Sequence, residues 1–291
     1  SVGLRYDYEQ ARCDFSKVQQ PLNGNGETKS LEQFNRSLHF GQFTPRFSMQ
    51  YLSSHNQLFY ASVSKGYKAG GFNVSFLNND DYLYSPEYNW NYEIGTKLSF
   101  LNNRLSADLS LFYIDWRNQQ ITNTIPTVGN VIRNAGRSRN KGIEASFQAR
   151  PTKSWMMYMN YGYTDARFVH YQKEERGILK DYGGNYLPMV PRHTFSLTTG
   201  YSFYDICSWI DRLTLNAGVS VTGPIYWYED NQAKQSPYAL VNLRISINKG
   251  CFTWEAWSKN TDYLSYYFVT SKAYAQKGKP ITLGTSVSIS L

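Results

Sequence analysis

The sequence lacks any apolar run long enough to form a transmembrane helix. Such a helix needs roughly 18 or more consecutive apolar residues, and no stretch of this chain approaches that length. A β-strand crosses a bilayer with only about 9–11 residues and buries one face, so a membrane β-barrel stays open. We also expect no signal peptide within this chain, because residues 1–6 show an alternating strand pattern from the start. If the protein is exported, we expect its N-terminal part to lie outside this chain.

Cysteine is scarce, and its spacing predicts neither a disulfide framework nor a zinc site. The chain holds 3 Cys, with no CxxC pair and no His/Cys spacing typical of zinc. We place Cys13 at the end of a strand, and Cys207 and Cys251 in short turns, as unpaired residues. The polar run at 78–81 lies in a predicted loop without the spacing of a calcium-binding loop. We therefore expect no metal site and no cofactor.

Histidine is also rare, which bears on catalysis. An outer-membrane phospholipase of similar length would carry a His two residues before a Ser on a strand. None of the 4 His has that context; they are His39, His55, His170 and His193. Nucleophilic catalysis also requires an oriented base beside the nucleophile, and the sequence offers none. We therefore predict that the protein is not an enzyme. A haem ligand in a loop would have to be His170, which is more simply an exposed loop residue.

The positive charge is spread along the chain. The formal net charge is +8, but the basic residues are scattered through turns, loops and alternate strand positions. A nucleic-acid-binding surface requires clustered basic residues, so we expect no nucleic-acid partner.

Aromatic residues are abundant in a chain that is polar on average. Phe, Trp and Tyr make up 16% of the residues, while the mean hydropathy is −0.52. Aromatic side chains favour pleated sheets. This mixture is typical of a barrel with an apolar outer belt, a polar lumen and wet loops.

Apolar and polar residues alternate with a period of two in twelve segments, which predicts β-strands with one apolar face. In 213–222, for example, Leu213, Leu215 and Ala217 alternate with Thr214 and Asn216. The predicted strands are 1–10, 43–53, 57–67, 88–100, 104–118, 132–150, 154–168, 192–203, 212–226, 235–248, 251–260 and 280–291. The segment 132–150 is longer than a bilayer requires, so we expect it to rise above the membrane.

The connections between these strands alternate strictly between long and short. The long ones are 11–42, 68–87, 119–131, 169–191, 227–234 and 261–279; the short ones are 53–56, 101–103, 151–153, 204–211 and 249–250. Bacterial barrels have short periplasmic turns and longer extracellular loops. The sequence therefore predicts an all-β fold, an antiparallel transmembrane up-and-down barrel, with both chain ends on the periplasmic side.

Aromatic residues near the predicted strand ends are typical of interfacial girdles. They are Tyr6, Tyr8, Tyr88, Trp90, Tyr113, Trp116, Tyr226, Trp227, Tyr228, Tyr263, Tyr266, Tyr267 and Phe268.

Several stretches, in this order, resemble the C-terminal barrel of TonB-dependent receptors. They include 43–48 (FTPRFS), 58–73 (LFYASVSKGYKAGGFN), 86–97 (PEYNWNYEIGTK), 134–144 (NAGRSRNKGIE), 190–194 (VPRHT), 257–262 (WSKNTD) and 278–284 (GKPITLG). Their order and spacing across all 291 residues make the match specific. The chain departs from the family at its last residue, Leu291, where the family usually has an aromatic residue.

The resemblance implies a 22-stranded barrel around an N-terminal plug. Residues 1–291 would then be the C-terminal part of that barrel, with about twelve strands of a probable 22, and the plug and TonB box would lie outside this chain. The whole receptor would bind a scarce nutrient, with a ferric siderophore or another iron complex favoured, and import it with energy from TonB. It would lie in the lipid of a Gram-negative outer membrane, and a surface lipoprotein is a further possible partner.

The resemblance also implies a ligand site made by extracellular loops and the upper lumen. Aromatic and basic groups there suit an anionic iron complex. The candidate ligand-binding residues are Tyr67, Lys68, Phe72, Tyr84, Arg133, Arg137, Arg139, Lys173, Arg176, Tyr226, Trp227 and Tyr228. Glu93, Lys97 and Glu144 fall on the polar faces of their strands, so we expect them in the lumen, facing the plug.

Two alternatives from other classes stay open. A self-contained twelve-stranded passive pore or adhesin-like barrel predicts that the first strand pairs with the last. A soluble all-β binding protein predicts solubility without detergent.

Overall fold

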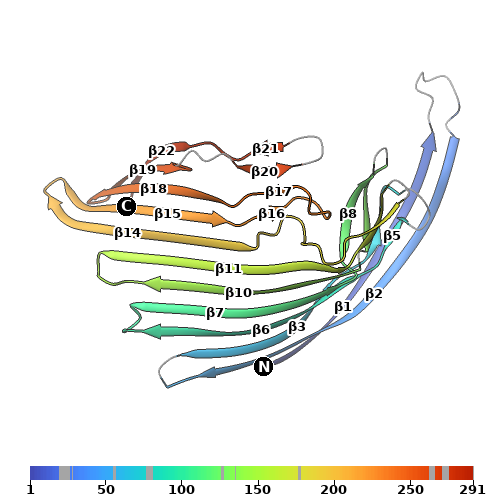
Figure 1. Ribbon diagram of the computed structural model, residues 1–291, viewed down its shortest axis with the longest axis horizontal. Coiled ribbons are helices and arrows are strands. Elements are labelled where there is room, and N and C mark those ends of the chain that lie inside the picture. The colour runs from blue at the N-terminus through green and yellow to red at the C-terminus, as the bar shows by residue number, and fades with distance from the viewer. Residues whose placement is uncertain are drawn as a thin grey trace.

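The chain folds into one curved antiparallel sheet of twelve strands (Figure 1). The computed structural model describes residues 1–19, 27, 29–54, 57–76, 81–125, 128–134, 136–175, 178–261, 266–270 and 275–290. The sheet strands are β1 (Val2–Gln19), β2 (Lys29–Leu52), β3 (Leu58–Lys68), β6 (Glu87–Phe100), β7 (Leu105–Arg117), β10 (Arg137–Ala149), β11 (Trp155–His170), β14 (His193–Cys207), β15 (Ile210–Thr222), β18 (Tyr238–Lys249), β19 (Phe252–Lys259) and β22 (Thr282–Ile289). The predicted all-β, antiparallel architecture is confirmed.

Neighbouring strands in the sheet are neighbours along the chain, as in an up-and-down barrel. The order runs from β1 through β2, β3 and so on to β22 without a crossover. In the described part of the chain, β1 pairs with β2 alone and β22 pairs with β19 alone. The sheet therefore has two free edges.

Long and short connections alternate as expected, and each long connection after the first contains its own hairpin. The added strands are β4 (Gly71–Phe72) with β5 (Leu83–Tyr84), β8 (Gln120–Ile125) with β9 (Gly129–Asn134), β12 (Gln172–Glu175) with β13 (Ile178–Asp181), β16 (Ile225–Tyr226) with β17 (Lys234–Gln235), and β20 (Tyr267–Thr270) with β21 (Ala275–Lys277). Figure 1 shows the labelled hairpin strands gathered toward one end of the sheet, opposite the short turns. We call these the loop end and the turn end.

The strand register gives the sheet one apolar and one polar face. Directly paired residues in an antiparallel sheet project from the same face. Leu111 pairs with Ile94 on one side and Ile143 on the other, and all three are exposed. The next row pairs Ser110 with Gly95 and Glu144. In a barrel the apolar face is the outward one, since it meets lipid, and the polar face lines the lumen.

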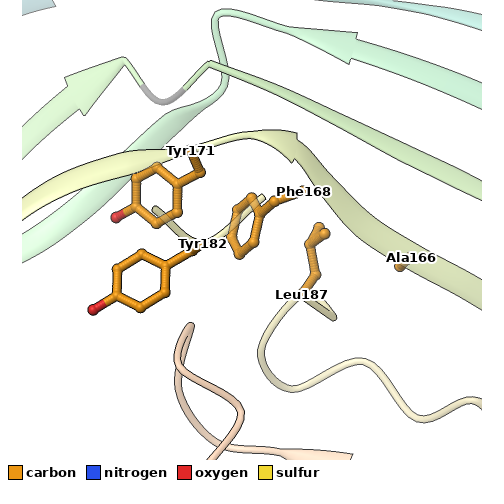
Figure 2. Packing of buried hydrophobic residues seen from close by; sticks show 5 residues of the cluster. All are labelled: Ala166, Phe168, Tyr171, Tyr182 and Leu187. Atoms are coloured by element: carbon orange, nitrogen blue, oxygen red, sulfur yellow. The ribbon is translucent and has the colours of Figure 1, made fainter. Parts of the chain in front are cut away.

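A single sheet has no second layer to bury its strands, so the buried residues gather at the loop end. One cluster holds five of them, Ala166, Phe168, Tyr171, Tyr182 and Leu187, as Figure 2 shows. The partly buried Ile121 of β8 and Val190 pack against this cluster. The cluster thus joins the upper end of β11 to the segments that follow it.

Four predicted ranges are wrong. Residues 11–42 were predicted as a loop, but β1 and β2 extend through most of this range, and Cys13 lies inside β1 opposite Arg36. Residues 132–150 form two strands, β9 and β10, and 119–131 contains a hairpin in place of a loop. The turn predicted at 204–211 is shorter, because β14 ends at Cys207 and β15 begins at Ile210.

The predicted aromatic girdle is only partly outward. Trp90 and Tyr113 share the outward face with Ile94 and Leu111. Trp116 pairs with Ser138 and therefore lies on the polar face, while Trp227 is buried within the loop end. Tyr263 lies outside the described residues, and the side chain of Phe268 does too.

Within the described chain, no helix has the length and apolar character needed to cross a membrane.

Candidate functional site

The predicted ligand-binding residues lie at the loop end of the sheet. Tyr67 and Lys68 end β3, Phe72 is in β4, Tyr84 in β5, Arg133 in β9, Arg137 and Arg139 in β10, Lys173 in β12 and Tyr226 in β16, with Trp227 and Tyr228 directly after it. Arg176 lies outside the described residues. Contact of any of these residues with a ligand stays a prediction.

The side-chain amide of Asn73 joins the loop between β3 and β6 to the loop between β7 and β10. Its Oδ1 accepts a bond from the Ile132 amide at 2.8 Å, and its Nδ2 donates to the Ile132 carbonyl at 2.8 Å. Nδ2 also donates to the Asp81 carbonyl at 2.6 Å. The residue is only 5% exposed. The buried side-chain amide thus makes the same pair of hydrogen bonds with the Ile132 backbone that a neighbouring β-strand would make.

Asn134 makes the same kind of contact, but its side chain belongs to the loop between β7 and β10 and bonds to the backbone of the loop between β3 and β6. Its Oδ1 accepts from the Ser85 amide at 2.7 Å, and its Nδ2 donates to the Ser85 carbonyl at 2.9 Å. Nearby, the backbone N–H of Gln120 donates to the carboxylate of Glu87. The two loops, 69–86 and 118–136, are therefore connected in both directions, and we call them the first loop pair.

An ion pair completes the first loop pair. Arg133 donates from Nε to Asp81 Oδ1 at 2.7 Å and from a terminal nitrogen to Oδ2 at 2.6 Å. Asp81 is only 8% exposed, so the bidentate bond offsets the cost of burying its carboxylate. Arg133, a predicted ligand residue, thus also holds the two loops together, while its side chain stays 38% exposed.

A second loop pair joins residues 171–192 to residues 223–235. The Tyr186 amide donates to Asn231 Oδ1 at 2.7 Å, and Asn231 Nδ2 donates to the Tyr186 carbonyl at 2.9 Å. The rings of Tyr186 and Tyr226 stack with centroids 5.5 Å apart and an interplanar angle of 9°. Lys173 reaches Glu229 at 3.5 Å across the same boundary.

Cations cover this tyrosine stack. The guanidinium carbon of Arg167 lies 4.0 Å from the centre of the Tyr186 ring, and that of Arg192 lies 4.9 Å from it. Lys234 Nζ lies 5.9 Å from the ring centre of Tyr226. Aromatic rings attract cations through their negative faces. Two of the predicted aromatic and basic residues, Tyr226 and Lys173, therefore lie in one cross-linked unit.

Arg137 and Arg139 lie on the outward face, apart from the inward side chains. Arg137 pairs with Arg117, and Arg139 pairs with Asp115 and Arg167. Asp115 is two residues from Tyr113 on β7 and therefore projects from the same, outward face. Its partners Arg137, Arg139 and Arg117 project outward with it, on the loop side of the apolar rows. Asp115 is buried, and its carboxylate accepts hydrogen bonds from Arg137 at 2.5 Å and from Arg117 at 2.9 Å, which offset the cost of burying its charge.

The register places Glu93, Lys97 and Glu144 on the polar face of the sheet, as their sequence pattern indicates. Glu93 accepts a hydrogen bond from the Tyr60 hydroxyl at 2.6 Å. Lys97 lies directly opposite Asp108, and Glu144 lies opposite Ser110. Their contact with a plug stays a prediction.

Sequence reasoning did not identify the residues that connect the loops. Asn73, Asn134, Asn231, Asp81 and Tyr186 carry these connections, but a polar residue in a predicted loop is unremarkable without its partner. Asn231 has a φ of 55°, which Asn tolerates better than most residues. No pattern in the sequence signals that its amide would face Tyr186.

Within the described part of the chain, no three His, Cys, Asp or Glu residues gather to hold a metal ion. His39 Nδ1 lies 2.8 Å from the Tyr8 hydroxyl, and His193 Nδ1 lies 3.0 Å from the Tyr161 hydroxyl. The three cysteines are unpaired.

Comparison with known proteins decides the family. Residues 1–261 match the family described as TonB dependent receptor-like, beta-barrel. The chain belongs to this family. The TonB-dependent receptors are a family of transporters and receptors and not one of enzymes. The resemblance that the sequence motifs predicted is therefore confirmed.

Curated relatives of this TonB-dependent receptor barrel include proteins of three organisms. It is 26% identical over 269 residues to the probable TonB-dependent siderophore receptor PiuA of Acinetobacter baumannii, covering 85% of this chain and 34% of the relative. It is 24% identical over 244 residues to the pesticin receptor of Yersinia pestis, covering 82% and 33%. It is 25% identical over 244 residues to the ferrichrome outer membrane transporter/phage receptor of Escherichia coli, covering 82% and 30%. The chain thus spans about a third of the length of these relatives.

Solved structures share the fold. The crystal structure of the siderophore receptor PiuA from Acinetobacter baumannii matches with a TM-score of 0.76 at 22% identity, covering 98% of this chain and 39% of that one. The ferric yersiniabactin uptake receptor FyuA from Yersinia pestis matches with a TM-score of 0.74 at 20% identity, covering 99% and 42%.

Proposed function

We propose that this chain is part of the barrel wall of an outer-membrane receptor that binds an iron complex, with a ferric siderophore favoured, and imports it with energy from TonB. The observation that carries the proposal is the two-faced sheet, with exposed apolar rows on one side, polar rows on the other and cross-linked loops at one end. Such a wall suits a lipid-embedded barrel whose loops meet a ligand from outside.

The relatives support an iron complex as the cargo. Their printed names include a siderophore receptor and a ferrichrome outer membrane transporter. The printed title of one structural relative is that of a ferric yersiniabactin uptake receptor. A shared family with these proteins favours the same class of ligand here, and the aromatic and basic residues of the second loop pair suit an anionic complex.

We further propose that the plug and the remaining strands belong to a polypeptide longer than this chain, and that TonB acts through that plug. Glu93, Lys97 and Glu144 would then meet the plug from the polar face. We also propose a surface lipoprotein as a further partner. The size of the native polypeptide tests this: an immunoblot of outer-membrane fractions should show a band more than twice the 33.6 kDa of this chain. A band near 34 kDa would contradict the plug and the TonB coupling.

The rival function is a passive twelve-stranded pore or adhesin-like barrel. It requires β1 to pair with β22, but in the described residues each of these strands pairs with one neighbour only. This observation favours a wall that other strands extend.

Uptake of labelled iron tests the transport step. Deleting the gene should abolish uptake of at least one radiolabelled ferric siderophore from a panel of hydroxamates and catecholates, and the intact gene should restore it. The same strain without TonB should not take up that complex. Unchanged uptake of every complex after deletion would refute the proposal, and uptake without TonB would favour the passive pore.

A further inference from the structure

The inward face of the wall carries two arginines side by side near the turn end. Arg104 and Arg150 lie opposite each other where β7 begins and β10 ends, and the Arg150 amide donates to the Arg104 carbonyl at 2.7 Å. Each lies an even number of residues from an inward residue of its strand, Ser110 or Glu144, so both side chains project into the lumen. Both are exposed. Like charges directly opposite each other in a sheet repel, so a bound anion would stabilise this pair.

The two arginines line one flank of a recess of about 660 Å³, which we call the lumenal recess. Lys153, from the turn between β10 and β11, lines the recess beside them, and Arg212 of β15 lines its opposite flank. Among the described residues that line it, none is Asp or Glu. The volume lies in the usual range for small-molecule sites. Four basic side chains therefore surround a space of this size with no carboxylate in its lining.

Small side chains lie between the two basic flanks. Gly200, Ser202 and Thr214 line the recess from the neighbouring strands β14 and β15, with Ser202 Oγ and Thr214 Oγ1 3.0 Å apart. On the far flank, Arg212 donates from Nε to Asn248 Oδ1 at 3.1 Å. A guanidinium has five N–H donors, so this bond leaves others for an anion. The small floor leaves room for a bulky anion between the flanks.

A second, smaller recess continues from the first toward the loop end. The two share Asn216, and the second has a volume of about 340 Å³. Arg244, Trp257 and Lys259 line it. Lys259 Nζ lies 5.0 Å from the ring centre of Trp257, while one carboxylate, Glu255, lies 3.9 Å from Arg244. Basic side chains therefore follow the inner side of the wall from this recess down to the turn end.

We propose that the lumenal recess holds the anionic iron complex inside the barrel before the complex leaves at the turn end. This rests on the proposed function. Clustered basic groups in a concave site attract an anion, and the guanidinium N–H groups bond to its oxygen atoms. Passage through a pore requires sites that bind strongly enough to admit an ion and weakly enough to release it, which two adjoining recesses supply. The site lies at the opposite end of the wall from the predicted ligand-binding loops and adds to them.

Equilibrium dialysis of the full-length, detergent-solubilised receptor tests the lumenal recess. The probe is a radiolabelled, trianionic ferric tris-catecholate, and a neutral ferric tris-hydroxamate of similar size is the comparison. The variant Arg150→Gln/Arg212→Gln removes a charge from each flank and should lose about one bound tris-catecholate per receptor. Its binding of the neutral complex should not change. TonB is absent from this measurement, so a failure of the proposed import would leave the result unaffected.

The matched control is Arg46→Gln/Lys249→Gln. Arg46 pairs with Ser64 on the inward face, and Lys249 lies at the turn end; both are exposed, and neither lines the lumenal recess. The control should bind the tris-catecholate like the unmodified protein. Undiminished binding by the recess variant, an equal loss in the control, or an equal loss of the neutral complex would each overturn the proposal.

Two further measurements distinguish other occupants of the lumenal recess. Displacement of the tris-catecholate by inorganic phosphate at low millimolar concentration would make the recess a site for small anions. A carboxylate from another part of the receptor would be stabilised by the arginines, and Arg150→Gln would then lower the midpoint of thermal unfolding. We expect an equal or higher midpoint, because this substitution relieves the repulsion with Arg104. Either contrary result would overturn the proposal, and the unfolding transition also shows that each variant is folded.

Discussion

Asn231 binds the backbone of Tyr186 as a neighbouring strand would. One hydrogen bond runs from the Tyr186 amide to Oδ1 at 2.7 Å, and the other runs from Nδ2 to the Tyr186 carbonyl at 2.9 Å. This side chain thereby joins two loops that are far apart in sequence. Asn73 and Asn134 make the same two-bond contact with Ile132 and Ser85.

Replacing Asn231 with Ala should therefore loosen the second loop pair. The two lost bonds to the backbone contribute about 1 kcal/mol each, so hydrogen exchange at the Tyr186 amide should speed up about thirtyfold. Exchange mass spectrometry of loop peptides measures this. The adjacent variant Gln232→Ala is the control, because Gln232 is exposed and bonds only to Asp230. Equal protection in the two variants would show that Asn231 does not hold the loops.

Asp81→Asn should weaken the first loop pair. The buried carboxylate receives both bonds from Arg133, so losing its charge should cost about 1–3 kcal/mol of local stability. We expect faster proteolysis and faster exchange in residues 69–86 and 118–136. Asp14→Asn is the control, since the Arg12–Asp14 pair is 3.6 Å long and both side chains are exposed; its effect should stay within about 0.5 kcal/mol. A comparable effect of both variants would argue against a special role for Asp81.

The two faces of β15 can be distinguished by one charge. Leu215→Lys places an ammonium group on the apolar face and should cost about 2–4 kcal/mol in a bilayer, whereas Asn216→Lys places it on the polar face and should cost little. Folding into lipid vesicles under denaturant provides the comparison. If the two variants were equally stable, the assignment of the lipid-facing side would be wrong.

The wall of the sheet could be predicted from sequence, because in the bilayer every outward position must be apolar. Beyond the bilayer this requirement ends, and the pattern weakens or reverses. In β1, the polar Arg12 and Asp14 face outward, while Phe15 faces inward and packs on Phe34 and Phe76. The upper halves of β1 and β2 therefore looked like a loop.

The candidate site was harder to predict than the wall. Its aromatic and basic composition pointed to the loop end, where the described candidates lie. The direction in which each side chain points could not be predicted. Arg137 and Arg139 were predicted to be part of a ligand site, but their strand register places them on the outward face. Direction depends on pairing between strands, and the amide contacts of Asn73 and Asn231 depend on loop conformation, which local sequence does not encode.

The two free edges of the sheet have a chemical consequence. Along β1 and β22, the backbone groups that face away from β2 and β19 have no strand to bond in the described chain. In hydrocarbon, each unpaired peptide group costs several kcal/mol. In water, the same groups are a template onto which any extended chain can add. This polypeptide by itself is therefore prone to self-association through its edges, and only a continuous ring of hydrogen bonds makes such a wall inert.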